Sequence, residues 1–146
     1  DLIKNKKFIN NWVSKKDGGI YYAMNKGIKI ASGDIIGILN SDDFYPNSFV
    51  LNNIVESFRK HNCDAVYGDL VYVKENNISK VSRYWRSGDY SISKIRNGWM
   101  LPHPTFFVKK EIYEKKNNFY RSWYMDANCY DYCSNYLLGF RSRYET

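Results

Sequence analysis

The stretch 17–43 constrains the fold of this chain more than any other part of the sequence. After a Gly-Gly turn, residues 20–30 carry apolar side chains at helical spacing, which predicts a helix. A Ser-Gly-Asp break then separates this helix from the apolar segment 35–39, which predicts a strand. Asp42 and Asp43 follow that strand. In an open α/β sheet, ligands bind beyond the carboxyl ends of the strands, so we expect these two carboxylates at a binding site.

The rest of the chain predicts further helices and strands in alternation. The expected helices cover residues 48–60, 90–97, 110–116 and 130–138, the expected strands cover 9–13, 65–73, 81–85 and 105–108, and residues 2–8 look like the end of another helix. The second and third of these strands form a hairpin. Gly68, inside the second strand, predicts a bulge or the close approach of another group. This order is typical of an α/β fold, so we expect one domain, residues 1–146, with a mixed sheet flanked by helices.

The composition favours a globular protein of the cytoplasm. No apolar run approaches the roughly 18 to 20 residues that cross a membrane, and the first residues lack the apolar centre of a signal peptide. The three cysteines, Cys63, Cys129 and Cys133, show neither zinc-type nor redox spacing, which is typical of reduced thiols.

The formal net charge of +7 suits nucleic acid, an anionic membrane surface or a phosphorylated substrate. The lysines are scattered, and we find no nucleic-acid-binding motif, so a basic nucleic-acid-binding domain ranks last among our hypotheses. Peripheral contact with the anionic inner face of the cell membrane is a hypothesis that the charge supports. A general bias of the composition toward lysine explains the charge equally well.

The pair Asp42 and Asp43 has two interpretations. Two hard oxygen donors after a strand suit Mg²⁺ or Mn²⁺, with substrate phosphates completing the coordination shell. Alternatively, the pair belongs to a turn, because Asp and Asn favour turns by bonding their own backbone. The dipeptide alone does not separate the two.

A longer sequence pattern favours the metal-binding interpretation of this pair. The run from Trp12 to Asp43 resembles the family 2 glycosyltransferases of the GT-A fold, whose bacterial members share an Ile-Tyr-Asp-Ala-Met-Asn-Lys-Gly-Ile segment followed by Ala-x-Gly-Asp and a strand that ends in Asn-Ser-Asp-Asp. The matching residues are Ser14, Asp17, Gly19, Ile20, Tyr21, Ala23, Met24, Asn25, Lys26, Gly27, Ile28, Ala31, Gly33, Asp34, Asn40, Ser41, Asp42 and Asp43. Weaker similarity lies in the segments 66–69 and 103–108. The resemblance implies a GT-A-like, Rossmann-related sheet.

The resemblance also implies an activity. Family members transfer a sugar, with inversion, from a nucleotide-diphosphate donor, usually a UDP-sugar, to an acceptor hydroxyl in polysaccharide or glycoconjugate synthesis. By this resemblance Asp43, with Asp42 beside it, holds Mn²⁺ or Mg²⁺ against the diphosphate, where charge grows as the nucleotide leaves. The residues that the resemblance assigns to donor binding are Asp17, Gly19, Asn25, Lys26, Ser41 and Asp42. The acceptor would be a glycan or a lipid-linked sugar.

An inverting transfer needs a base that takes the proton of the acceptor hydroxyl. By resemblance this base opens the last helix, and we place it at Asp131, with Asp126 in reserve. An alignment without a gap would instead put Asn128 there, and an amide cannot accept the proton. For each carboxylate, capping a helix or lying in solvent is an equally good explanation.

Two residues are candidates for the acceptor or phosphate side of the site. His103, between two prolines, either binds phosphate or shapes its loop. Trp99 either stacks on a sugar face or packs in the core, as aromatic side chains more often do.

The chain also departs from the family pattern. Tyr22 stands where the family has an aspartate, and the family's first strand with its Asp-Gly-x-Ser-x-Asp segment has no counterpart before Asp1. A βαβ unit takes roughly 30 residues, so we expect an N-terminally truncated domain that lacks a nucleotide-binding element. The alternative to an active glycosyltransferase is therefore a non-catalytic relative that acts as a binding module.

Overall fold

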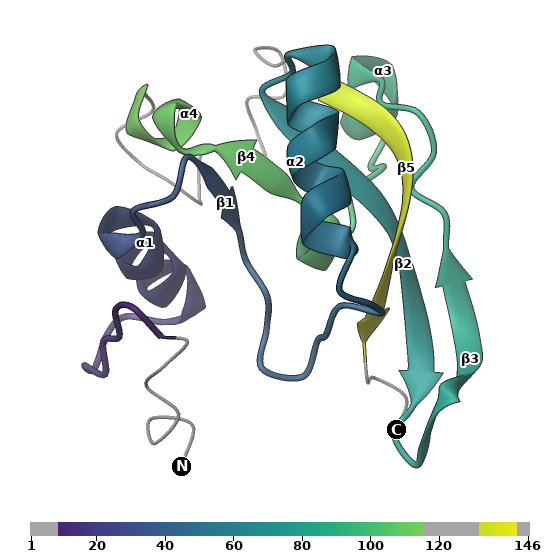
Figure 1. Cartoon of the computed structure of the whole chain (residues 1–146), viewed down its shortest axis with the longest axis horizontal. Coiled ribbons are helices and arrows are strands. Elements are labelled where there is room, and N and C mark those ends of the chain that lie inside the picture. The colour runs from purple at the N-terminus through teal and green to yellow at the C-terminus, as the bar shows by residue number, and fades with distance from the viewer. Residues whose placement is uncertain (1–8, 116–131, 143–146) are drawn as a thin grey trace.

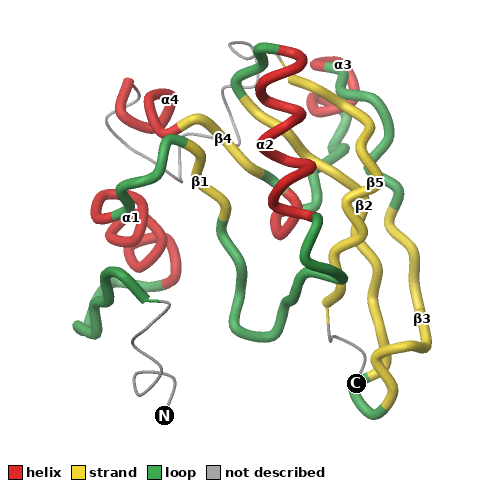
Figure 2. The backbone as a smooth tube through the Cα atoms, in the orientation of Figure 1, coloured by secondary structure: helices red, strands yellow, loops and turns green. Residues whose placement is uncertain are grey.

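The computed structural model describes residues 9–115 and 132–142 of the chain. Helices and strands alternate along it, as Figures 1 and 2 show. In chain order the elements are α1 (Ile20–Ile30), β1 (Ile35–Gly37), α2 (Val50–His61), β2 (Ala65–Lys74), β3 (Asn77–Trp85), α3 (Ile92–Arg96), the 3-10 helix η2 (His103–Thr105), β4 (Phe107–Lys109), α4 (Lys110–Lys115) and β5 (Tyr132–Ser142). The fold is a mixed α/β fold, as expected.

One sheet organises these elements. Its strands lie in the order β1-β4-β2-β3, and each neighbouring pair in this order is antiparallel. The fifth strand, β5, pairs with β2 in parallel, which makes the sheet mixed. The hairpin expected from the sequence is confirmed, because β2 and β3 pair directly across a short turn that follows Lys74.

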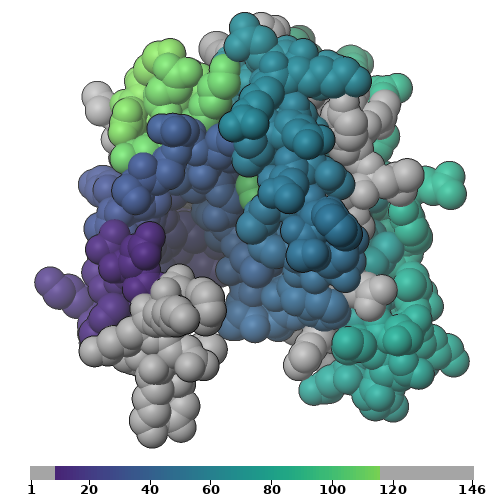
Figure 3. All heavy atoms as spheres, viewed as in Figure 1, coloured from purple at the N-terminus to yellow at the C-terminus, as the bar shows by residue number. Residues whose placement is uncertain are grey.

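Apolar side chains cover both faces of the sheet. On one face, Ile54 and Phe58 of α2 pack against Val66 of β2 and Phe107 of β4. The alternation of a strand sends Tyr67, the next residue of β2, to the opposite face. There a second cluster joins residues of α1, β1, β2, β4 and α4 with Phe106, which precedes β4: Ile28, Ile36, Ala65, Tyr67, Phe106, Val108, Ile112 and Tyr113. In Figure 3, the atoms of α2 lie in front of the sheet and hide much of it from this side.

The start of α1 shows why this helix follows from its sequence. Gly19 has φ +125°, a value that a residue with a side chain rarely adopts. Asp17 Oδ1 accepts a hydrogen bond from Gly19 N at 3.1 Å, which fixes the turn before the helix. From there Met24 and Ile28 face the sheet on successive turns, and Ile28 is only 2% exposed. The helix expected at 20–30 is confirmed to the residue.

Two expected elements are wrong. Residues 9–13 form no strand: they lie apart from the described sheet, and Trp12 is 58% exposed. Residues 132–142 form β5 instead of part of a helix that covers 130–138. Tyr, Cys and Phe at the positions where β5 pairs with β2 suit a strand, and Gly139 disfavours a helix.

Among the residues that the structure describes, none of the helices combines the length and the apolar character that crossing a membrane requires. The segment expected to end a helix at 2–8 lies outside the described residues.

Candidate functional site

A tight turn after β1 holds Asp43, the second of the two adjacent carboxylates that the sequence singles out. Asp43 N donates to Asn40 O at 3.1 Å, and Asn40 Nδ2 donates to Asp43 Oδ2 at 2.8 Å. Asp43 is 8% exposed, so its charge is buried and the Asn40 amide is one of the groups that stabilise it. The backbone of this segment therefore forms a turn, as one of the two interpretations of Asp42 and Asp43 predicts.

The neighbouring residues of the turn are more open. Asp42 is half-buried and Ser41 is exposed, so the two carboxylates differ in environment although they are adjacent. The buried side chain of Asp43 is held in place by its contacts, whereas the more open side chain of Asp42 is accessible to a ligand. Among the described residues, no group of three or more His, Cys, Asp or Glu side chains gathers as a metal cage.

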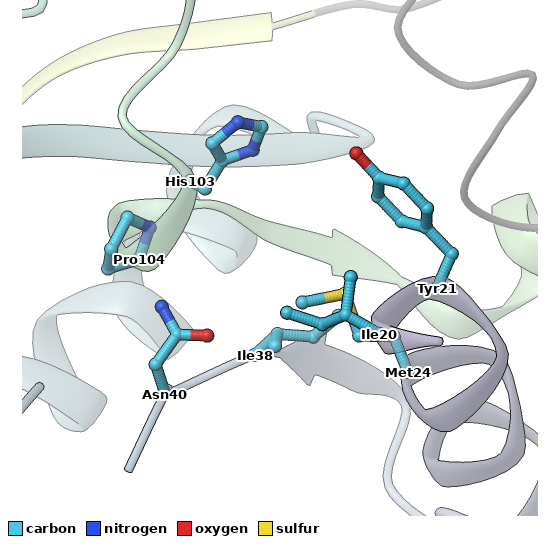
Figure 4. A pocket seen from close by; sticks show the side chains of 7 residues that line it. All are labelled: Ile20, Tyr21, Met24, Ile38, Asn40, His103 and Pro104. Carbon is cyan, nitrogen blue, oxygen red and sulfur yellow. The ribbon is translucent and has the colours of Figure 1, made fainter. Parts of the chain in front are cut away.

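A cavity of about 200 Å³ lies between the turn after β1, α1 and η2. Ile20, Tyr21 and Met24 line it from α1 (Figure 4). The remaining walls are Ile38 and Asn40 after β1, and His103 and Pro104 of η2. Figure 4 shows the Tyr21 hydroxyl and the His103 ring on one side of the cavity and the Asn40 amide on the other.

This cavity combines an aliphatic wall with three polar side chains from three separate segments. The residue His103 is exposed, but partial desolvation of its ring lowers its pKa below the usual value of 6.5. This shift favours the neutral imidazole, which can both donate and accept a hydrogen bond. Small-molecule sites usually measure roughly 300–1,000 Å³, so the cavity has room for a sugar or a phosphate but not for a whole nucleotide sugar. Asn40 connects it to Asp43.

The other predicted donor-binding residues lie along α1 and just before it. Asp17 Oδ2 is 3.3 Å from Lys26 Nζ, an exposed ion pair of small energetic worth. Asn25 Oδ1 is buried and accepts no hydrogen bond from the described part of the chain. Gly19 precedes the cavity-lining Ile20 directly. None of these four residues lines the cavity itself.

Trp99 lies away from the cavity. Its ring meets Tyr67 edge-on at 6.2 Å and Tyr90 at 6.5 Å between centroids, and Trp99 Nε1 donates to Ser87 O at 3.0 Å. Ser87 is itself tied to β2, because its N and Oγ both donate to Asp69 Oδ1. These contacts match the core-packing alternative for Trp99.

Trp99→Phe tests this packing role. The phenyl ring keeps most of the aromatic contact but leaves the Ser87 carbonyl without the indole donor, so we expect the free energy of unfolding to fall by about 1 kcal/mol. Urea denaturation measures the change. Trp85→Phe is a control that also replaces one tryptophan, and nucleotide-sugar binding that weakens only in the Trp99 variant would contradict a purely structural role.

The two candidate bases, Asp131 and Asp126, lie outside the described residues, so their roles stay predictions. The helix on which the placement of Asp131 relied is replaced by β5, which begins one residue later.

Two residues of this site received no role from the sequence. Asn40 and Tyr21 belong to the pattern of matching residues, yet only the structure shows Asn40 between the cavity and Asp43. The Asn-x-x-Asp spacing, typical of a side-chain-capped turn, is the signal that could have identified Asn40. Tyr21 is 53% exposed, and no comparable sequence signal identifies it.

Comparison with known proteins gives this site a context. A family model described as "Glycosyl transferase family 2" matches residues 4–134. Two proteins of Mycobacterium tuberculosis, from strains CDC 1551 / Oshkosh and ATCC 25618 / H37Rv, are each called an uncharacterized glycosyltransferase. Each is 46% identical to this chain over 46 residues, which are 32% of the chain and 18% of the relative. The chain thus matches only a small part of the length of these relatives.

Proposed function

Because this chain belongs to glycosyl transferase family 2, we propose that it transfers a sugar from a nucleotide-diphosphate donor to an acceptor hydroxyl, with inversion at the anomeric carbon. The donor we propose is a UDP-sugar. In this reaction the acceptor oxygen forms a bond to the anomeric carbon while the bond from that carbon to the diphosphate oxygen breaks. The acceptor loses its proton to a base, and the nucleoside diphosphate leaves with the electron pair.

The observation that carries the proposal is the turn after β1. It links the buried carboxylate of Asp43 to the Asn40 side chain, and Asn40 and His103 line the same cavity. A sugar or phosphate in this cavity would meet an amide, a neutral imidazole and the Tyr21 hydroxyl, all of which can bond to oxygen atoms. The aliphatic wall of Ile20 and Ile38 would exclude water from its other side.

The carboxylate pair also fits a divalent cation. Mg²⁺ and Mn²⁺ are commonly held by one or two carboxylates while substrate phosphates complete the shell, so a cage of three or more protein ligands is not needed. We assign this role to Asp43 and Asp42, with Ser41 beside the donor. When bound, the cation would neutralise charge on the departing diphosphate. We assign Asn25 to donor binding from the pattern of the family.

The base and the physiological setting are further parts of the proposal. We assign the base to Asp131, with Asp126 in reserve, from the pattern of the family. We propose a glycan or lipid-linked acceptor met in the cytoplasm at the inner face of the membrane, as the excess of basic residues supports. A GT-A-like arrangement of the sheet belongs to the same proposal.

A donor screen tests the function. The chain is mixed with a panel of nucleotide sugars and Mn²⁺, and both binding and release of nucleoside diphosphate are followed. We expect one UDP-sugar to bind at least about tenfold more tightly with Mn²⁺ than with EDTA, a difference of about 1.4 kcal/mol. Binding without release would identify a binding module, and no binding to any nucleotide sugar would contradict the proposal.

A further inference from the structure

A single buried hydroxyl joins η2 to the centre of the sheet. Thr105, the last residue of η2, is 0% exposed. Its Oγ1 donates to Gly68 O at 2.8 Å, lies 2.8 Å from Pro102 O, and accepts a hydrogen bond from Gly68 N at 3.3 Å. A threonine hydroxyl has one proton and two acceptor lone pairs, so this proton serves two carbonyls while a lone pair receives the amide. The proton of this hydroxyl and one of its lone pairs are therefore engaged within the protein.

Gly68 explains why this contact occurs at that point of β2. The sequence predicts a bulge or a close approach at Gly68, and the pairing of β2 with β5 shifts in register on both sides of it. Thr105 is the group that approaches. The backbone of β2 offers both its N–H and its C=O to the same side-chain oxygen, a contact that a strand residue flanked by regular partners could not make.

Thr105 is connected to His103 by a short segment whose backbone is restrained. Thr105 N donates to Pro102 O at 3.0 Å and Phe106 N donates to His103 O at 3.2 Å, so the turn of η2 is closed on both sides of His103. Pro102 and Pro104 fix the backbone φ angle of the residues that flank the histidine. The backbone at His103 therefore has little freedom to move while Thr105 is held.

We propose that Thr105 is a positioning residue, which holds the His103 imidazole at the wall of the cavity opposite Asn40. Its purpose rests on the proposed function, in which this cavity receives a sugar or a phosphate. The geometric part of the inference, that Thr105 fixes the imidazole, does not depend on that function and can be tested without a substrate.

The test is a titration of the histidine side chains by NMR in the full chain, with Thr105→Val as the main variant. Valine has the shape of threonine but lacks its hydroxyl, so η2 loses its link to Gly68. The chain contains only two histidines, His61 and His103, which makes their resonances simple to assign. Burial lowers the pKa of His103. We expect this pKa to rise toward 6.5 in the valine variant, because an imidazole that is no longer held at the cavity wall loses the partial desolvation that it has there.

Matched variants separate positioning from a general loss of structure. Thr105→Ser keeps the hydroxyl and should leave the His103 titration as in the unmodified chain. The resonances of His61, in the last turn of α2, should not respond to any of the substitutions. Thr105→Cys, which keeps a weaker donor, should shift the His103 titration by an intermediate amount, and it decides the question if the valine variant does not fold.

An unchanged His103 titration in a folded valine or cysteine variant would overturn the inference, as would an equal shift in the serine variant. If the chain binds a UDP-sugar, the valine variant should also bind it several-fold more weakly while the serine variant does not. A shifted titration without any nucleotide-sugar binding would uphold the positioning role and contradict the proposed function, so the two failures are distinguishable.

Discussion

Asp43→Asn is expected to abolish most of the proposed transferase activity, with kcat/KM falling about 10²–10³-fold, the usual cost of removing one group that stabilises charge in a transition state. Asparagine keeps the size of the side chain, and its amide oxygen can still accept the hydrogen bond from Asn40 Nδ2. The fold should therefore persist while the negative charge is lost. The reason for the expected loss is the proposed cation, which needs that charge to stay against the diphosphate. Steady-state kinetics with a nucleotide sugar and Mn²⁺ measure the effect.

Asp64→Asn is the matched control for this experiment. Asp64 lies in the connection between α2 and β2, is partly exposed and pairs with Lys109 at 3.6 Å, away from the cavity. Its substitution should change kcat/KM less than twofold. If Asp43→Asn retained full activity and the same response to Mn²⁺ as the unmodified chain, Asp43 would not be a ligand of the cation.

Gly37→Val is expected to lower the free energy of unfolding by about 1–3 kcal/mol, the usual cost of overpacking a core. Gly37 pairs with Phe107 across β1 and β4, and a Cβ on Gly37 would overlap Cε1 of the Phe107 ring. Phe107 is 4% exposed and belongs to the cluster under α2, so the ring has little space to move. For a chain of this size each kcal/mol corresponds to a loss of roughly 2–4 °C in Tm, which thermal unfolding followed by circular dichroism detects.

Gly27→Ala is the opposite case and the matched control. Gly27 lies inside α1, and a Cβ built there has no neighbour within 4 Å. Alanine removes the flexibility that glycine brings to a helix, so stability should rise by about 0.5–1 kcal/mol. Equal behaviour of the two variants would show that the Phe107 ring does not determine the cost at Gly37.

The sequence predicted most local elements and the β2–β3 hairpin, but it did not predict which segments distant in sequence pair as strands. The helix 20–30 was predictable because a glycine turn, helical spacing and a Ser-Gly break all lie within it or beside it. Residues 9–13 were a short strand candidate, but a strand also needs a partner, and that information is not local. The helix predicted at 130–138 was wrong for a related reason, because the pairing of residues 132–142 with β2 outweighed the helical pattern.

The site was predictable only in part. The turn after β1 could be located from its Asn-Ser-Asp-Asp run, because the residues that form it are adjacent in sequence. The cavity could not be, because Tyr21, Asn40 and His103 come from three segments that only the folded sheet brings together. The link from Thr105 to Gly68 spans 37 residues and likewise has no local signature beyond the glycine.

The two apolar clusters on either face of the sheet share strands β2 and β4, since neighbouring residues of these strands, such as Val66 and Tyr67, belong to different clusters. We therefore expect the two sides to melt together, because both rest on the same hydrogen-bonded backbone. Damage far from the cavity, for instance under α2, should therefore reach the ligand-facing residues as all-or-none loss of structure rather than as gradual loosening.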